Sequence, residues 1–217
     1  LDDAAGHPLM KVFFTGKEIK SIIEVMLVAY QDRNSSYYPR FFDLRFFFNP
    51  KRFFLDRVFD IQVKKNGQWQ SVDIHDEKTL YSIGTTSYVG SFLWLIEKVS
   101  YGLFSIQPKN EQGEPIDGVK SALIPPHKHG QKELKAWVAL IDHIARFRDT
   151  DNNGMPDIPV IGEYEEAPIV EVDSLSPYYL FKNATIVQWT ASSLFIILTI
   201  LGFFLALKLY KWSLRRK

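Results

Sequence analysis

The C-terminal segment constrains this chain more than any other part of it. Residues 189–207 (WTASSLFIILTILGFFLAL) carry no charged side chain. As an α-helix, a segment of this length is ~28 Å long, which is close to the ~30 Å hydrocarbon core of a bilayer. The ten residues that follow (KLYKWSLRRK) contain five cations. An apolar helix with a short basic tail is typical of a membrane anchor whose C-terminus is cytoplasmic.

These signals predict four regions: a folded ectodomain at 1–173, a juxtamembrane stalk at 174–186, a single transmembrane helix at 187–209, and a basic cytoplasmic tail at 210–217. The ectodomain is then expected on the extracytoplasmic side, in a periplasm or its equivalent, and membrane lipid is a predicted partner. The chain begins at Leu1 without a signal peptide, so we expect an upstream segment of a longer precursor to direct export.

The charge distribution argues against nucleic-acid binding, and the lack of cysteine excludes disulfides and thiolate metal sites. The net charge is +1, but every charged residue after Asp173 is a cation, so the predicted ectodomain is net acidic. A nucleic-acid partner is therefore not expected, because binding phosphates requires a basic face. The chain has no cysteine, which excludes disulfides and thiolate metal sites.

Hydrophobic periodicity predicts a mixed, irregular order of strands and helices, which favours the α+β class. The clearest hairpin joins 57–63 to 69–72 through an Asn66-Gly67 turn. The other predicted strands are 8–14, 42–48 and 80–88, and the predicted helices are 17–30, 92–99 and 132–147.

An aspartate-rich loop at 149–157 (DTDNNGMPD) is the sharpest chemical motif. Oxygen ligands at alternate positions, with a glycine that permits the turn, are typical of calcium loops. Val160 stands where an EF-hand requires glutamate, so we expect a free-standing structural Ca²⁺ loop. The alternative is a polar turn that caps the preceding helix. The predicted ligands are Asp149, Asp151, Asn153, Asp157 and the carbonyl of Met155.

The remaining motifs point less clearly to a binding or catalytic site. Eight phenylalanines fall within 41–59, and this cluster is expected to form core or a contact surface, the alternative being base stacking. His127 and His129 flank Lys128, but a zinc site needs further ligands. No GxSxG, P-loop or GxGxxG motif is present. The sequence therefore predicts no catalytic centre in this chain.

Several segments together resemble the C-terminal domain of the 5′-nucleotidase / UDP-sugar hydrolase family. In chain order they are GHPL at 6–9, FFTGKEIK at 13–20, DLRF at 43–46, DRV at 56–58, LYSIGTTSY at 80–88, GLFSI at 102–106, PK at 108–109 and ELKAWVAL at 133–140. The resemblance covers about residues 6–160 and fits membrane-anchored bacterial members.

The resemblance implies a division of labour. In that family an N-terminal metallophosphoesterase domain hydrolyses the substrate, and the C-terminal domain stacks the nucleoside between two aromatic rings. One ring follows a GGDG-like loop, and the matching stretch here (SYVGSF, 87–92) lacks that loop and leaves Phe92 as the candidate ring. The metallophosphoesterase domain is absent from this chain, so the chain alone is not expected to hydrolyse a substrate.

Two functions follow from these observations. The chain is either the membrane-anchored, substrate-binding-type part of a 5′-nucleotidase-like protein, whose partner is an N-terminal metallophosphoesterase half, or a non-catalytic accessory subunit of a larger membrane complex. The second function would use the phenylalanine-rich face and the transmembrane helix for docking.

Overall fold

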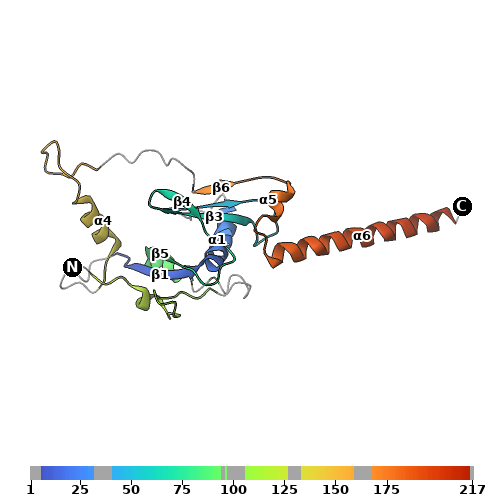
Figure 1. The fold of residues 1–217 in the computed structure, drawn as a ribbon, viewed down its shortest axis with the longest axis horizontal. Helices are drawn as coiled ribbons and strands as arrows, with labels where there is room; N and C mark the ends of the chain where they lie inside the picture. Colours follow the sequence, from blue (N-terminus) through green and yellow to red (C-terminus); the bar gives the residue numbers. More distant parts are fainter. Residues whose placement is uncertain are drawn as a thin grey trace. The chain divides into compact units, whose positions relative to one another are not determined.

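The computed structural model describes residues 6–31, 41–93, 96, 106–126, 133–158 and 168–215. The chain folds into helices and two separate sheets, consistent with the α+β class (Figure 1). It divides into two compact units. The first unit comprises residues 1–41 and 72–168, and the second comprises residues 42–71 and 169–217.

The first unit is built on an antiparallel pair of strands. Strand β1 (Leu9–Thr15) pairs with β5 (Leu80–Thr86) in a register that places Val12 opposite Ile83. Alternate side chains of β1 are fully buried, as expected for a strand with one face in the core. These buried residues are Met10, Val12 and Phe14.

Helix α1 (Gly16–Gln31) follows β1 without a loop. Its buried apolar residues have the i, i+3, i+4 spacing of an amphipathic helix, and they are Ile19, Ile22, Ile23 and Leu27. Thr15 and Glu18 form a capping box: the Thr15 N–H donates to Glu18 Oε2 at 2.9 Å, and the Glu18 N–H donates to Thr15 Oγ1 at 3.3 Å.

Two further contacts fix this helix start. A Cβ placed on Gly16 would lie 2.0 Å from the Asp73 carbonyl oxygen, so only glycine fits here. Glu18 also accepts hydrogen bonds from Lys109 and from the Gln107 N–H. Burial favours the neutral acid, but the hydrogen bonds from Lys109, Thr15 and Gln107 outweigh it and lower the pKa of Glu18.

The remaining described elements of the first unit are short. They are α2 (Ser87–Ser91), the 3₁₀ helix η2 (Val119–Ala122) and α4 (Ala136–Ile144). The predicted strand at 80–88 ends at Thr86, whose hydroxyl accepts a hydrogen bond from the Val89 N–H and caps α2. The predicted helix at 92–99 lies mostly outside the described residues.

Helix α4 is shorter than the predicted 132–147 helix. Beyond Ala145 the hydrogen bonds tighten to the i→i−3 type, from Arg146 to His143 and from Phe147 to Ile144. The helical pattern therefore closes in a tight turn before the aspartate-rich loop begins.

The second unit contains a four-stranded sheet in the order β4-β3-β2-β6. Its strands are β2 (Leu44–Phe48), β3 (Val58–Lys65), β4 (Gln68–Ser71) and β6 (Ile169–Glu171). The predicted hairpin is confirmed: Asn66 (φ 52°) and Gly67 (φ 78°) both have the positive φ of a type I′ turn. Strand β6 pairs in parallel with β2.

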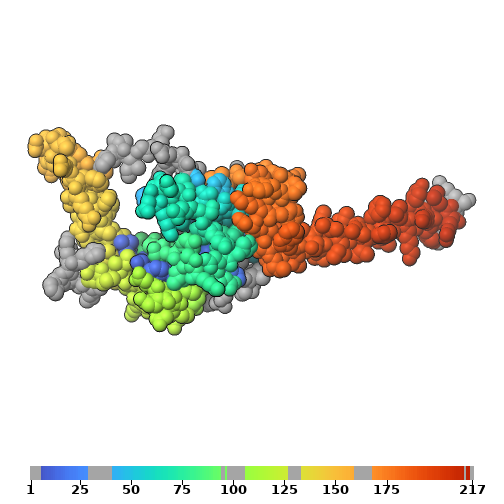
Figure 2. All heavy atoms as spheres, viewed as in Figure 1, coloured from blue at the N-terminus to red at the C-terminus, as the bar shows by residue number. Residues whose placement is uncertain are grey.

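The chain then leaves the sheet through α5 (Pro177–Phe181) and enters α6 (Ile186–Leu214). Residues 174–186, the predicted stalk, thus include a short helix. Helix α6 begins close to the predicted boundary at 187 but continues past 209, so the first part of the predicted tail is helical. In Figures 1 and 2 this helix extends as a rod from the second unit.

Candidate functional site

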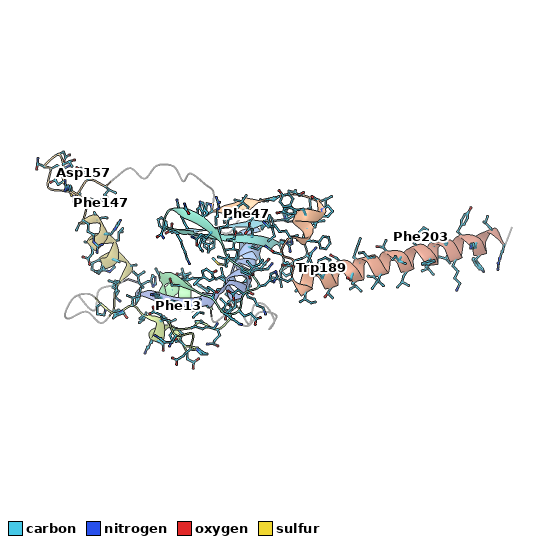
Figure 3. The ribbon with its side chains drawn as sticks, in the orientation of Figure 1. Phe13, Phe47, Phe147, Asp157, Trp189 and Phe203 are labelled. Atoms are coloured by element: carbon cyan, nitrogen blue, oxygen red, sulfur yellow. The ribbon has the colours of Figure 1, made fainter. Side chains whose placement is uncertain are left out.

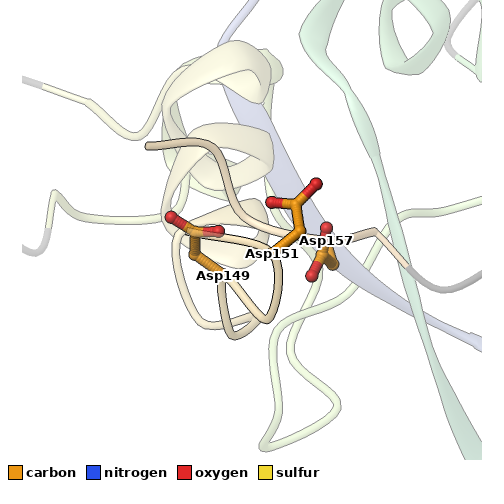
Figure 4. A group of neighbouring side chains, drawn as sticks. All are labelled: Asp149, Asp151 and Asp157. Carbon is orange, nitrogen blue, oxygen red and sulfur yellow. The ribbon is translucent and has the colours of Figure 1, made fainter. Parts of the chain in front are cut away.

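The aspartate-rich loop brings three of its predicted ligands together. One carboxylate oxygen from each of Asp149, Asp151 and Asp157 lies within 4.8 Å of the other two, and all three residues are exposed. Figure 4 shows these carboxylates around the curled loop. Positive φ values at Asn152 (56°) and Gly154 (86°) produce the curl.

Backbone amides of the loop hold the carboxylates in place. The Asn153 N–H donates to Asp149 Oδ1 and to Asp151 Oδ1, both at 3.1 Å, and the Gly154 N–H donates to Asp149 Oδ2 at 2.8 Å. The Asn153 side-chain amide donates to Asp151 Oδ2 at 2.8 Å. The side-chain oxygen of Asn153, another predicted ligand, accepts a hydrogen bond from the Met155 N–H at 2.8 Å.

Asp157 closes the loop from its far end. Its Oδ2 accepts hydrogen bonds from the Thr150 hydroxyl and from the Thr150 N–H, which together lower the pKa of Asp157. The carboxylate is therefore held in the charged form that a divalent cation requires. Each carboxylate has about four acceptor positions, so the amide contacts leave capacity for a metal. The oxygen-only donor set fits Ca²⁺ in kind.

Phe92, the predicted stacking ring, is 48% exposed at the end of α2. Its ring meets Tyr88 edge to face, with centroids 5.4 Å apart and planes at 90°. Tyr88 in turn lies 5.2 Å from the His7 ring. Neither Tyr88 nor His7 is among the site residues predicted from the sequence. These contacts make an exposed aromatic cluster in which Phe92 and Tyr88 are perpendicular rather than parallel.

The phenylalanine cluster at 41–59 divides between core and surface. Phe46, Phe48 and Phe59 are buried in the sheet of the second unit, whereas Phe42 is 82% exposed, Phe53 50% and Phe54 48%. The expected core role is thus confirmed for the three buried rings, whereas a contact surface formed by the exposed rings stays a prediction. His127 and His129 lie outside the described residues.

Helix α6 is long and apolar enough to cross a membrane from Ile186 to Trp212. No other helix in the described part of the chain has this length and apolar composition. None of its most apolar stretch is buried in the protein. Figure 2 shows its atoms bare on the viewed face, and Figure 3 shows Trp189 at its base and Phe203 along its length.

A buried ion pair fastens the start of α6 to the second unit. Arg52 Nη2 and Asp56 Oδ2 lie 3.4 Å apart, and both side chains are inaccessible to solvent. Arg52 Nη1 donates to the Lys182 carbonyl at 2.9 Å, and Asp56 Oδ2 accepts from the Thr185 N–H at 2.9 Å. The two charged residues thus hold both the end of α5 and the approach to α6.

Comparison with known proteins gives distant structural likenesses and no sequence match. No family model matches the chain, and no curated protein matches it. Among solved structures, a 5′-nucleotidase precursor from Thermus thermophilus is similar at a TM-score of 0.44 and 14% sequence identity. The match covers 78% of this chain and 26% of that one, so this chain spans about a quarter of the length of that protein.

Proposed function

We propose that this chain is a membrane-anchored, extracytoplasmic domain that forms the C-terminal, substrate-binding-type part of a 5′-nucleotidase-like protein and has no catalytic centre of its own. The main support for membrane anchoring is that the most apolar stretch of α6 is entirely unburied in the protein. Exposing this much apolar surface to water is unfavourable, whereas the same surface is matched to lipid. Lys208, Lys211 and Arg215 near its C-terminal end favour a cytoplasmic C-terminus.

The substrate-binding part of the proposal is supported by the order of nucleotidase-like segments along the sequence and by the exposed Phe92–Tyr88–His7 cluster. Aromatic faces of this kind stack on bases with roughly 1–3 kcal/mol per base. The perpendicular Phe92 and Tyr88 rings do not form a closed sandwich, so a base would stack on one exposed face.

Equilibrium dialysis of the full chain in mild detergent against radiolabelled adenosine tests this binding. We expect Phe92→Ala to weaken binding about tenfold, which corresponds to the loss of one stacking contact. Phe42→Ala, which removes an exposed ring in the other unit, serves as the control and is expected to have no effect. Adenosine binding that Phe92→Ala leaves unchanged, or no binding at all, would refute the proposal.

A structural calcium site at 149–157 is a further part of the proposal. Its support is the convergence of Asp149, Asp151 and Asp157, with Asn153 and Met155 following in the same curl. A bound Ca²⁺ would neutralise the repulsion between the three carboxylates and so stabilise the loop.

The accessory-subunit function has one observation in its favour, which is the exposure of Phe42, Phe53 and Phe54. Purification of the native protein in mild detergent separates the two functions. Stoichiometric co-elution with other membrane subunits would favour the accessory role, and an intact mass that includes a metallophosphoesterase half would favour the nucleotidase role.

A further inference from the structure

The loop between β2 and β3 (residues 49–57, here the aromatic loop) presents two phenylalanines to solvent. Phe53 and Phe54 are each about half exposed, at 50% and 48%. Backbone hydrogen bonds fix the conformation of this loop. The Asn49 N–H donates to the Arg57 carbonyl at 2.9 Å, and the Asp56 N–H donates to the Phe53 carbonyl at 3.0 Å. The fold therefore holds both rings outward.

The aromatic loop is fixed beside the first turn of α6. The Phe53 N–H donates to Gln188 Oε1 at 2.8 Å, and Gln188 is only 5% exposed. The next residue, Trp189, stacks on Phe181 with centroids 4.8 Å apart. Phe53, Phe181 and Trp189 thus lie together where α6 leaves the folded part, and Figure 3 labels Trp189 at this position.

A groove of ≈ 700 Å³ runs between the aromatic loop and α6. This volume is within the range of about 300–1,000 Å³ that small-molecule sites have. Its wall on α6 includes Ala191, Leu194, Phe195 and Leu198, which follow one helical stripe. From Gln188 to Leu198 the helix advances ~15 Å, which is about the depth of one bilayer leaflet.

One exposed cation lines the groove. It is Lys51, whose Nζ lies 3.4 Å from Asp173 Oδ1. An ammonium has three donors, so this solvent-exposed pair leaves Lys51 able to donate to a phosphate as well. A cation beside an apolar, aromatic wall combines the two chemistries that a phospholipid needs, one for its phosphate and one for its acyl chain.

We propose that the aromatic loop and the first four turns of α6 form a phospholipid site, in which Phe53 and Phe54 enter the leaflet, an acyl chain occupies the groove, and Lys51 contacts the headgroup phosphate. This inference rests on the membrane insertion of α6 proposed above. It adds a second membrane contact, which would fix the orientation of the second unit on the bilayer surface.

Site-directed spin labelling tests the insertion, and the absence of native cysteine makes it direct. The full chain is reconstituted in liposomes of phosphatidylcholine and phosphatidylglycerol as three variants: Phe54→Cys in the loop, Leu198→Cys in α6, and Gln68→Cys on the exposed β-hairpin. Each label is exposed to oxygen, which concentrates in lipid, and to a nickel chelate, which stays in water.

We expect oxygen to relax the labels at positions 54 and 198 more strongly, and the nickel chelate to relax the label at 68. Relaxation of the position 54 label by nickel, with 198 still relaxed by oxygen, would overturn the lipid site while leaving the anchor intact, and the aromatic loop would then be a protein-docking surface. Relaxation of both by nickel would overturn the anchor and the lipid site together.

Native mass spectrometry tests the seated lipid. We expect the wild-type chain, released from the same liposomes, to retain phospholipid, and a Phe53→Ala/Phe54→Ala double variant to retain several-fold less. Phe42→Ala is the matched control, because it removes an exposed phenylalanine of the same unit that does not line the groove. Equal retention by all three proteins, or none by the wild type, would overturn the proposal.

Discussion

Replacement of Asp56 by alanine is expected to destabilise the second unit strongly. Asp56 is fully buried, lies 3.4 Å from the Arg52 guanidinium and accepts the Thr185 N–H. The substitution removes one partner of a buried ion pair and one hydrogen bond to the segment that leads into α6. Removing one partner of such a pair typically costs about 3–5 kcal/mol, because a buried charge loses its compensation.

For a chain of 217 residues, each kcal/mol changes the thermal midpoint by roughly 2–4 °C, so the expected decrease is roughly 6–20 °C. The assay is thermal unfolding in mild detergent, followed by near-ultraviolet circular dichroism. Asp56→Asn keeps an oxygen for the Thr185 N–H and is expected to have a smaller effect. The double variant Arg52→Met/Asp56→Leu removes both charges and is expected to recover part of the loss.

Asp173→Ala is the matched control, because it breaks an exposed pair with Lys51 in the same unit. Such a pair is worth at most about 1 kcal/mol. If Asp56→Ala lowered the thermal midpoint no more than Asp173→Ala does, the buried ion pair would not be what holds the start of α6.

Three other outcomes are expected. Titration calorimetry should detect Ca²⁺ binding that Asp151→Ala abolishes, and unchanged heat would count against the calcium loop. Gly16→Ala should lower the thermal midpoint more than Gly84→Ala, because only at position 16 would a Cβ collide with backbone. The lowered pKa of Glu18 means that its stabilising effect is present above its ordinary value of 4.5 and is lost as pH falls through the folded-state pKa; Glu18→Gln should reduce this acid sensitivity in midpoints measured between pH 2 and 7.

Local sequence signals predicted the elements whose conformation depends on residues close together in the sequence. Strand β1, helix α1 and the Asn66-Gly67 hairpin lie where the alternation, the helical periodicity and the turn residues placed them. The convergence of the loop aspartates also followed from spacing alone, because a curled loop brings alternate side chains to one point.

Long-range features could not be predicted in the same way. The parallel pairing of β6 with β2 joins segments more than 120 residues apart, and the contact of Asp56 with Thr185 spans 129 residues. Which phenylalanines of the 41–59 cluster are buried depends on where strand β2 ends. Phe46 and Phe48 lie in β2 and are buried, whereas Phe53 and Phe54 follow it and are exposed.

We propose that α6 spans a bilayer with the folded units on the extracytoplasmic side. Labelling with a membrane-impermeant maleimide, in source cells stripped of any outer envelope, tests it directly on single-thiol variants Gln68→Cys and Arg215→Cys. We expect the thiol at position 68 to react in intact cells and the thiol at 215 to react only after permeabilisation. Reaction of both thiols in intact cells, or the reverse order, would show that α6 does not span the bilayer in this orientation.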